Sequence, residues 1–480
     1  MNRLDELRKK IDEIDQELMK LIDERYRLTK DVGIIKAKLA VPVTNNSREE
    51  EILNKASNYL YSDEIVSLYK EMFLLNKNYQ GFKYGLIAKD ISYSLSPLVY
   101  YFMGLDNYKL IKSNDFNKTI NKLVYNGLNV TNPYKNDAFK YCTSHDDSAI
   151  ITNSVNLIID TKGYNTDYLA LKEIFKENDL YSKKVLIIGN GATANSVYMA
   201  LNKNVKKIVR TIKEENEDLI SNYKNYLDYD CIINTTPYGT SPNYQFEPLF
   251  SLEEFTKLKL VIDVVYNPIC TPLIAEAKKY NIKTIGGVNL LVGQAVINYN
   301  LWFNKQINKD VVLSKVKKHL YNVVLIGMSF SGKTTLGEKL SKDLNKDYID
   351  IDHELAKENL SLSEVLKKGD LKTFRKHEES YTINYAKKFN QVISTGGGII
   401  LNDFAMENLK LNGIIVYLET SIETIKQRMD NSRPLLQNID DLNRMFIDRI
   451  DKYEKYSMII LHENMKYEEI LVKINEAISN

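Results

Sequence analysis

The sequence has few cysteines, no excess of charge of either sign and no long hydrophobic run. Its 480 residues include three cysteines at wide spacing and no CxxC pair, so we expect neither a disulfide framework nor a zinc site. The formal net charge of +2 gives no reason to expect binding to nucleic acid or to a membrane. No run approaches the ~20 apolar residues of a membrane span, and the first residues, MNRLDELRKKIDEID, are too charged for a signal peptide. We therefore expect a soluble, cytoplasmic protein.

The length of the chain and the changes in its residue pattern predict three domains, since one domain usually takes roughly 100–200 residues. Residues 1–80 contain one glycine and one proline and follow a helical pattern. From residue 81 short apolar runs alternate with helical stretches, which favours parallel sheets, and a new alternation of this kind starts at Val323. We expect boundaries near residues 81 and 320, hence domains at 1–80, 81–320 and 321–480. The middle domain divides into a lobe at about 81–180, completed by a C-terminal helix, and a second lobe at about 181–288.

The first domain is expected to be a three-helix, all-α module. Its first helix carries an apolar seam with the 3–4 spacing of an amphipathic helix. The seam residues are Leu4, Leu7, Ile11, Ile14, Leu18, Leu21, Leu28, Val32 and Ile35, with Arg25 in the same series. Further helices are expected near 47–60 and 63–79. A small core with a long apolar seam invites a partner chain.

The last domain carries a phosphate-binding loop. Gly327-Met-Ser-Phe-Ser331-Gly332-Lys333-Thr334 matches GxxxxGK[ST], follows a strand-like run and precedes a helical run from Thr335. Backbone N–H groups of such a loop surround phosphate oxygens, and the helix N-terminus adds positive potential. Lys333 supplies a charge to the outer phosphates and Thr334 a hydroxyl to Mg²⁺. The loop indicates a nucleoside triphosphate and leaves the phosphate acceptor open.

Further motifs in the last domain make it resemble shikimate kinase, an α/β P-loop fold. These motifs are Asp350-Ile-Asp352, Phe374-Arg375-Lys-His-Glu378, Gly396-Gly397-Gly398, Arg433-Pro434-Leu435-Leu436, and Arg449 ahead of Tyr453. The resemblance implies ATP, Mg²⁺ and shikimate as ligands. A gluconate or nucleotide kinase would share the phosphate loop but not this acceptor set.

The resemblance to shikimate kinase also implies a role for each motif. Arg375 and Arg449 would hold the carboxylate of shikimate, because guanidinium groups match carboxylates bidentately. Asp352 would orient and deprotonate the attacking hydroxyl. Gly396, Gly397 and Gly398 would let the backbone approach the ring closely, and Asp350 would support Mg²⁺. Arg433 would stabilise the transferring phosphoryl group, and Arg428 would lie along the adenine.

The middle domain contains a dinucleotide fingerprint. The strand-like run 185–188 leads into Gly189-Asn-Gly191-Ala192-Thr-Ala194, a GxGxxA pattern in strand–turn–helix context. The next strand ends in Arg210-Thr211, at the place where an NAD enzyme usually carries an acidic residue. A cation suits a 2′-phosphate, so the sequence favours NADP over NAD in a Rossmann lobe, although Arg210 is equally compatible with an ordinary surface charge.

The middle domain resembles shikimate dehydrogenase. The motifs that carry the resemblance are Ser94-Leu-Ser96-Pro97, Asn129-Val-Thr131-Asn-Pro133-Tyr-Lys135, Ser154-Val-Asn156, Asn165-Thr-Asp167, Asn234-Thr-Thr-Pro-Tyr-Gly239, Asp263 to Ile274, and Gln294. Reduction of a ketone needs hydride at carbon and a proton at oxygen. Lys135 can polarise or protonate that oxygen, and Asp167 can orient Lys135 and bind a hydroxyl. Ser94, Ser96, Thr131, Asn156 and Gln294 would bind a polyol. Quinate stays open as a further substrate, and the glycine usual in the family before the Asn156 motif is replaced in the region of Thr152-Asn153.

The first domain resembles the all-helical chorismate mutases. The residues that match the site of that family are Arg8, Arg25, Lys36, Arg48, Glu49 and Gln80, whereas Asn45 stands where an Asp is frequent. The resemblance implies that cations bind the two carboxylates of chorismate and that Lys36 and Gln80 donate to its ether oxygen. It also implies a homodimer in which Arg8 crosses to the partner site. As an alternative, the helices would only dimerise or bind an effector, on a chain with two activities.

Overall fold

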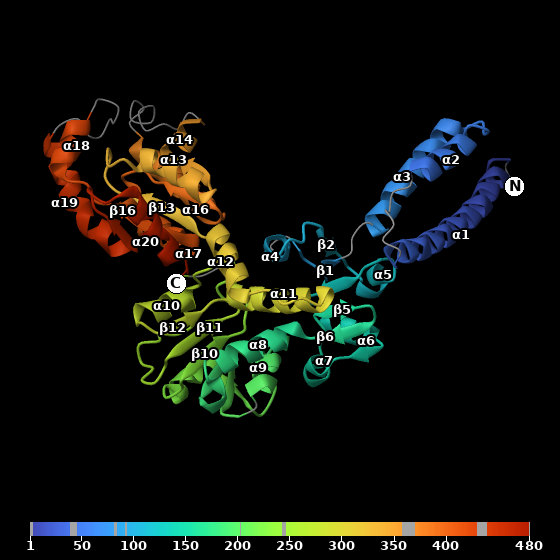
Figure 1. Ribbon diagram of the computed structural model, residues 1–480, viewed down its shortest axis with the longest axis horizontal. Coiled ribbons are helices and arrows are strands. Elements are labelled where there is room, and N and C mark those ends of the chain that lie inside the picture. The colour runs from blue at the N-terminus through green and yellow to red at the C-terminus, as the bar shows by residue number, and fades with distance from the viewer. Residues whose placement is uncertain are drawn as a thin grey trace. The chain divides into compact units, whose positions relative to one another are not determined.

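The structure is a computed structural model that describes residues 3–38, 46–80, 84–91, 94–201, 203–241, 246–357, 370–429 and 439–479. The chain forms two compact units (Figure 1). The first unit comprises Met1–Leu169 and Ala295–Gln306, and the second comprises Ala170–Gln294 and Ile307–Asn480. Each unit is described by itself.

The first unit begins with three helices, as the sequence predicts: α1 (Arg3–Lys38), α2 (Asn46–Ala56) and α3 (Ser62–Gln80). Helix α3 packs against both α1 and α2. Met72 and Phe73 of α3 are buried, but the predicted apolar seam of α1 is open to solvent, with Ile14 65% and Leu28 60% exposed. Among the residues that the structure describes, the apolar face of α1 therefore stays largely uncovered.

The first unit also holds a six-stranded sheet in the order β2-β1-β3-β5-β6-β4. Its elements are β1 (Tyr84–Ala88), α4 (Ser96–Phe102), β2 (Tyr108–Lys112), α5 (Phe116–Ile120), β3 (Gly127–Val130), α6 (Lys135–Tyr141), β4 (Ser144–His145), α7 (Asp147–Thr152), β5 (Leu157–Ile159), β6 (Lys162–Tyr164) and the start of α8 (Thr166–Glu177). Strands β2, β1 and β3 are parallel, whereas β5 pairs antiparallel with both β3 and β6. The sequence predicted a parallel sheet, and the β5–β6 hairpin makes this one mixed.

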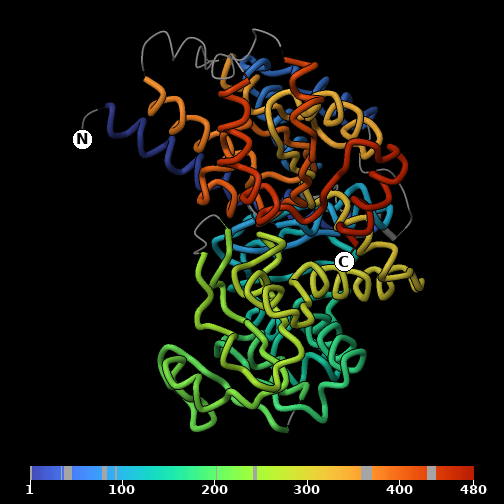
Figure 2. The backbone as a smooth tube through the Cα atoms, turned by 90° about the vertical axis from the view of Figure 1, so that its left-hand side faces the viewer, coloured from blue at the N-terminus to red at the C-terminus, as the bar shows by residue number. Residues whose placement is uncertain are grey.

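The second unit opens with an all-parallel sheet in the order β12-β11-β10-β7-β8-β9. Its elements are η1 (Leu180–Ser182), β7 (Val185–Ile188), α9 (Ala192–Leu201), β8 (Val205–Val209), β9 (Glu217–Leu219), η2 (Ile220–Tyr226), β10 (Cys231–Asn234), β11 (Leu260–Asp263), α10 (Pro272–Lys279), β12 (Lys283–Ile285) and α11 (Gly287–Phe303), which continues into the first unit. All four residues of β7 and of β10 are buried, as expected for strands covered on both faces. Strands β7 to β12 run through the green to yellow-green part of the tube in Figure 2, and α11 follows in yellow.

The rest of the second unit is a five-stranded parallel sheet in the order β14-β15-β13-β16-β17. Its elements are α12 (Lys309–Leu320), β13 (Asn322–Ile326), α13 (Lys333–Leu344), β14 (Asp347–Asp350), α14 (Ile351–Lys357), α16 (Leu371–Ala386), β15 (Gln391–Ser394), η3 (Ile399–Leu401), α17 (Asp403–Asn412), β16 (Gly413–Leu418), α18 (Ile422–Arg428), α19 (Ile439–Tyr456), β17 (Ile459–Leu461) and α20 (Tyr467–Ser479). Helix α12 packs against α20. Among the described helices of the whole chain, none is both long and apolar enough to cross a bilayer.

Candidate functional site

A lysine–carboxylate pair lies at one edge of the first sheet. Lys135 begins α6 just after β3, and Asp167 lies in the first turn of α8 just after β6. Strands β3 and β6 end at the same edge, because both pair antiparallel with β5 between them. Lys135 Nζ donates a hydrogen bond to Asp167 Oδ2 at 2.6 Å, and both side chains stay partly exposed at 19% and 23%. The pair is therefore held together and remains open to a ligand.

The other predicted polar residues of this region cluster at the same edge of the sheet. Thr131 follows β3, and Asn156 precedes β5 with its carbonyl accepting from Val130 N at 2.9 Å. The Asn156 side chain is buried, and its Oδ1 accepts from Thr166 N at 2.7 Å. Near the start of α4, Ser94 Oγ accepts from Ser96 N at 3.3 Å. These contacts make Asn156 a support for the first turn of α8, where Asp167 lies.

Asn153 takes up the backbone conformation for which the expected glycine is suited. It ends α7 with φ of 47°, in the left-handed region. Asparagine is the side-chain-bearing residue that tolerates this region best after glycine. The departure from the family pattern seen in the sequence therefore leaves the local backbone turn intact.

A buried hydrogen-bond network behind this edge was not predicted from the sequence. Asn298 of α11 accepts from Thr166 Oγ1 at 2.7 Å and donates to Tyr100 Oη at 2.8 Å, and Tyr100 in turn donates to Asn129 Oδ1 at 2.9 Å. Burial raises the pKa of Tyr100, so its hydroxyl stays protonated. No clear signal in the sequence marked Asn298, because α11 also carries Asn289, Gln294 and Asn300. Gln294, also on α11, donates to Leu291 O at 2.8 Å.

A cavity of about 510 Å³ opens at the carboxyl ends of β7, β8 and β10. The predicted residues Gly189, Gly191, Arg210 and Thr211 line it, together with Lys213, which the sequence analysis missed. The sequence could have indicated Lys213, because it lies only three positions after Arg210 in the same loop after β8. Arg210, Thr211 and Lys213 are exposed, and Ala192 begins α9 beside the cavity without lining it.

The backbone around this cavity suits a phosphate-bearing dinucleotide. Gly189 has φ of 115°, and a Cβ there would lie 2.8 Å from Thr235 Oγ1. A Cβ on Gly191 would meet nothing within 4 Å, which leaves open space at the N-terminus of α9. Two cations and a threonine hydroxyl beside β8 match the donors that a 2′-phosphate needs. The residues present therefore fit NADP(H).

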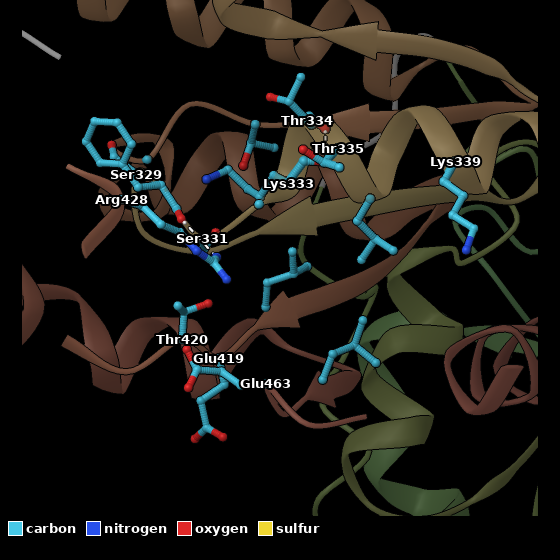
Figure 3. Close-up of a pocket in the computed structure, with 18 of the residues that line it drawn as sticks. Ser329, Ser331, Lys333, Thr334, Thr335, Lys339, Glu419, Thr420, Arg428 and Glu463 are labelled. Carbon is cyan, nitrogen blue, oxygen red and sulfur yellow. Dashed lines mark hydrogen bonds between the residues drawn. The ribbon is translucent and has the colours of Figure 1, made fainter. Parts of the chain in front are cut away.

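A second cavity, of about 650 Å³, surrounds the phosphate loop (Figure 3). Gly327 and Gly332 take φ of 150° and 95°, and Lys333 Nζ donates to Gly327 O at 2.9 Å and Met328 O at 2.8 Å. Ser331 Oγ is buried with no hydrogen-bond partner. Thr335 lines the same cavity. The loop thus has the shape and the polar atoms of a phosphate cradle, which fits ATP.

Two oxygen groups and one arginine complete the wall of this cavity. Thr334 Oγ1 donates to Asp350 Oδ2 at 3.1 Å, so two oxygen ligands of the kind that Mg²⁺ prefers are adjacent. The described residues contain no group of three or more His, Cys, Asp or Glu side chains able to hold a metal, so this pair would depend on ligand oxygens as well. Arg428 Nη1 donates to Phe330 O at 3.3 Å. Figure 3 shows Lys333 and Arg428 facing the same space, with Thr420 on the other side.

The glycine triplet after β15 lets charged side chains approach the backbone. A Cβ on Gly396 would lie 2.8 Å from Asp352 Oδ1 and 2.4 Å from Glu378 Oε1, and one on Gly398 would lie 2.3 Å from Arg375 Nη1. Any side chain at these positions would displace the predicted acceptor residues. The backbone of the triplet therefore packs directly against the predicted acceptor residues and forms one end of the site.

Two arginines stand at this end of the site. Arg375 Nη1 bonds Glu378 Oε2 at 2.5 Å, and Arg449 Nη1 donates to Gly397 O at 2.8 Å. Arg449 is 7% exposed, and its Nε is buried with no partner. Burial raises the pKa of Glu378, and Arg375 opposes that shift. Glu378 was present in the sequence motif but was not predicted to belong to the site. Arg433 lies outside the described residues.

The cations predicted on the first helices occupy different surroundings. The Arg25 guanidinium lies 5.6 Å from the ring centres of both Tyr69 and Phe73, and its Nη1 is buried with no hydrogen-bond partner. Glu49 Oε2 accepts from Lys77 Nζ at 2.8 Å, which links α2 to α3. Lys77 was not predicted. Arg25 therefore stands as a half-buried cation with donor capacity to spare.

The remaining predicted residues of the helical module are less enclosed. The Arg8 side chain is 68% exposed and lies 3.9 Å from Asp5, and Arg48 pairs with Glu51 at 2.5 Å. Lys36 is half-buried near the C-terminus of α1. Gln80 ends α3, but its side chain lies outside the described residues.

Comparison with protein families places three matches along the chain. The family model for chorismate mutase type II matches residues 7–81, that for the shikimate dehydrogenase substrate binding domain matches residues 86–158, and that for shikimate kinase matches residues 330–479. The three matches follow the order predicted from the sequence.

Individual relatives match the middle of the chain. A shikimate dehydrogenase of Sulfurisphaera tokodaii is 34% identical over 263 residues, which cover 50% of this chain and 96% of the relative. A shikimate dehydrogenase (NADP(+)) of Saccharolobus islandicus is 34% identical over 265 residues, which cover 51% of this chain and 96% of that relative. Among solved structures, a chorismate mutase/shikimate 5-dehydrogenase fusion protein from Clostridium acetobutylicum matches at 23% identity with a TM-score of 0.45, covering 49% of this chain and 97% of that one.

Proposed function

Because the chain belongs to the shikimate dehydrogenase family, with a chorismate mutase region before and a shikimate kinase region after the family match, we propose that it has three activities. It reduces 3-dehydroshikimate to shikimate with NADPH, phosphorylates shikimate with ATP, and rearranges chorismate to prephenate. The observation that carries the proposal is the Lys135–Asp167 pair at 2.6 Å, in which both side chains stay partly exposed. A lone surface ion pair would be common, but this one joins two helix starts at the polar edge of the sheet.

In the proposed reduction, Lys135 donates a proton to the ketone oxygen of the substrate. Bound NADPH supplies the hydride. Asp167 accepts a hydrogen bond from Lys135 Nζ, which orients the amine so that its other hydrogens can reach the substrate. Thr131, Ser94 and Ser96 supply hydroxyls for the polyol, and Gln294 an amide. Quinate stays an open second substrate, since its hydroxyls present similar partners.

The preference for NADP follows in the proposal from the charges beside β8. Arg210 and Lys213 both line the cofactor cavity, and Thr211 stands between them. A phosphate on the ribose would pair with these cations, whereas an unmodified ribose would leave them without an anion. The open space beside Gly191 would accept the pyrophosphate at the N-terminus of α9.

In the proposed phosphoryl transfer, the acceptor end of the site holds shikimate by its carboxylate. Arg449 keeps an unpartnered Nε, and Arg375 lies against Gly398, so the two guanidinium groups offer donors to one anion. Asp352 accepts the proton of the attacking hydroxyl. ATP supplies the phosphoryl group, with Mg²⁺ held by Thr334 and Asp350. Lys333 and Arg433 stabilise the charge on the transferred group, and Arg428 lies along the adenine.

For the proposed mutase, the helical module would act as a homodimer. Arg8 and Arg25 are 17 positions apart on α1, about 25 Å along the helix, so one chain cannot bring both to one ligand. The exposed seam that includes Ile14 and Leu28 provides the apolar surface for a second copy. In such a dimer Arg25, Arg48 and Lys36 of one chain and Arg8 of its partner would bind the carboxylates of chorismate, with Lys36 and Gln80 at the ether oxygen.

The alternative is a chain with two activities, in which the helices only dimerise or bind an effector. The exposed seam would serve that role equally well. The buried Nη1 of Arg25, which has no hydrogen-bond partner, favours the mutase, because it leaves a donor available to an anionic ligand.

The domain limits of the proposal remain those of the sequence, at 1–80, 81–320 and 321–480. Strands β1 and β13 begin close to the two boundaries, at Tyr84 and Asn322. Helix α12 (Lys309–Leu320), just before the second boundary, packs against α20 of the last domain. A cytoplasmic location also stays part of the proposal, supported by three free cysteines.

The test of the proposed function is to assay one purified chain with each of the three substrates. Variants Lys135→Ala, Arg375→Ala and Arg25→Ala should each abolish or cripple one activity and leave the other two near wild type. If the chain shows no rate above background with chorismate while α1 to α3 remain folded by circular dichroism, the two-activity alternative holds. Loss of all three activities in any single variant would indicate that this variant misfolds. A conservative variant, such as Arg375→Lys in place of Arg375→Ala, would then be assayed instead.

A further inference from the structure

The segment 264–271, which links β11 to α10, supports the wall of the cofactor cavity. Gly239 lines that cavity, and a Cβ on Gly239 would lie 3.2 Å from Pro272 Cδ and 3.6 Å from Thr271 Cβ. Two residues further on, Ser241 N donates to Asn267 O at 2.9 Å. The cavity wall formed by residues 235–239 therefore rests on this segment.

Buried side chains tie the same segment to the cavity wall. Thr271 Oγ1 donates to Asp263 Oδ2 at 2.6 Å, and Asn234 Nδ2 donates to Asp263 Oδ1 at 3.0 Å. Asn234 Oδ1 then accepts from Thr236 N at 3.1 Å, and Thr236 lines the cavity. Asp263, Thr271 and Asn234 are at most 1% exposed. A displacement of the segment would therefore reach Thr236 through three consecutive hydrogen bonds, of which the first two are buried and the third is partly buried.

The other side of the segment is held by the kinase-like region. Asn412, at the end of α17, accepts from Ile269 N at 3.0 Å with its Oδ1 and donates to Ala386 O at 3.2 Å with its Nδ2. The next amide of the segment, Cys270 N, donates to Leu411 O at 2.9 Å. Asn412 is 3% exposed and Ile269 7%, so these contacts are shielded from water. Nearby, the rings of Phe246 and Phe404 meet edge to face at 5.3 Å.

We propose that Asn412 of the kinase-like region is a positioning residue for the cofactor cavity of the dehydrogenase. It fixes the amide of Ile269 from one side while the chain Thr271–Asp263–Asn234 fixes the cavity wall from the other. The inference rests on the proposed function, because it takes the cavity to bind NADPH. The dehydrogenase would therefore depend on a residue that a dehydrogenase without a fused kinase does not have.

The proposed dependence has a physical reason. The backbone amides of Ile269 and Cys270 lie outside the regular strands, so they find their acceptors in the kinase-like region. A buried N–H group that loses its acceptor destabilises the conformation that buries it. If Asn412 were lost, the segment would move to find another acceptor or water, and it would carry Thr271 with it. The expected consequence is weaker NADPH binding with unchanged ATP binding, since Asn412 does not line the phosphate-loop cavity.

The experiment compares Asn412→Ala and Asn412→Leu with a matched control in the full chain. Asn322 is a second buried asparagine of the kinase-like region, and its side chain also makes two hydrogen bonds to backbone, with Gln391 N at 2.9 Å and Lys388 O at 2.8 Å. Asn322→Ala and Asn322→Leu thus remove the same chemistry without touching segment 264–271. The leucine variants keep the side-chain volume, so they separate a lost hydrogen bond from a cavity. NADPH affinity is measured by fluorescence titration, and the Michaelis constant for ATP by the kinase assay.

The inference predicts that both Asn412 variants weaken NADPH affinity about tenfold, consistent with the loss of one buried hydrogen bond, and keep the Michaelis constant for ATP within twofold. The Asn322 variants should leave NADPH affinity unchanged even if they lower the unfolding temperature equally. Unchanged NADPH affinity in a folded Asn412 variant, or an equal loss in both pairs, would overturn the inference and leave the proposed function standing. Failure of the wild-type chain to bind NADPH would instead overturn the proposed dehydrogenase and the inference together.

Discussion

Lys135 and Asp167, 32 positions apart in the sequence, meet at 2.6 Å where α6 and α8 begin. The pair combines two features that a proton relay needs, namely a direct hydrogen bond and partial exposure of both groups. The first prediction concerns this pair. Lys135→Ala should lower kcat for 3-dehydroshikimate reduction by about 10²–10⁴-fold, the usual range for a lost proton donor, and leave NADPH affinity unchanged. Steady-state kinetics with NADPH titration measure both quantities.

The matched control for Lys135 is Lys140→Ala, at the exposed end of the same helix. It should retain wild-type turnover. If Lys135→Ala also keeps full turnover, the ion pair is structural and the assignment of the proton donor is wrong.

The second prediction concerns cofactor choice. Arg210→Ser should raise the Michaelis constant for NADPH about tenfold, because a charge-assisted hydrogen bond to the 2′-phosphate is lost. The constant for NADH should change little, since NADH lacks that phosphate. The double variant with Lys213→Ser should extend the loss. Lys203→Ala, exposed at the other end of β8, serves as the control, and an equal change for both cofactors would mean that Arg210 does not read the phosphate.

The third prediction concerns the phosphate acceptor. Arg375→Ala should raise the Michaelis constant for shikimate by about 10–100-fold, because a charged hydrogen bond contributes about 1.5–3 kcal/mol. The constant for ATP should stay near wild type. Arg444→Ala on the exposed face of α19 is the control for loss of an arginine. Equal weakening of both ligands in Arg375→Ala would argue for a general disturbance of the Arg375–Glu378 pair.

The fourth prediction tests the shared site of the proposed dimer. Arg8→Ala and Arg25→Ala should each remove most mutase activity. Mixed in equal amounts and allowed to exchange, they should recover about one quarter of wild-type activity, because half of the dimers would be mixed and each mixed dimer would contain one intact site. No recovery, with exchange confirmed by mass spectrometry, would place both arginines in a site within one chain or outside any site.

The fifth prediction concerns the dependence of stability on pH. Burial raises the pKa of Asp263 from 3.8 to about 6, against the hydrogen bonds from Thr271, Val265 and Asn234. The folded state therefore binds this proton more readily than the unfolded state, so this contribution to stability is largest below pH 4 and falls as the pH rises through 6. Between pH 7.5 and 4.5 the wild type should gain about 2 kcal/mol relative to Asp263→Asn, which cannot titrate. Denaturant titrations of both proteins at each pH measure this difference in the free energy of unfolding. If the difference between the two proteins does not change with pH, the assignment of the pKa shift is wrong.

The order and type of the main elements could be predicted from the sequence because their patterns are local. The amphipathic spacing of α1, the buried runs of β7 and β13, and the glycines of the phosphate loop all depend on neighbours in the chain. The Lys135–Asp167 contact could be expected only through the resemblance to a family, since the spacing of the two residues does not imply a contact. The structure supplies the reason in the β5 strand that aligns the ends of β3 and β6.

Other features could not be read from the sequence because they depend on distant packing. Asn298 and Tyr100 are 198 positions apart and Ile269 and Asn412 are 143 apart, and no periodicity relates such pairs. The apolar seam of α1 indicated in the sequence that this face invites a partner chain, and Ile14 on that seam is 65% exposed.

The central claim is that one chain carries both the dehydrogenase and the kinase, and the most direct test is to follow these two consecutive steps together. The purified protein is supplied with 3-dehydroshikimate, NADPH, ATP and Mg²⁺, and NADP⁺ and ADP are both quantified at completion. The account predicts equal amounts of the two products, with no ADP formed when NADPH is left out. Oxidation of NADPH without formation of ADP, or formation of ADP without NADPH, would contradict it.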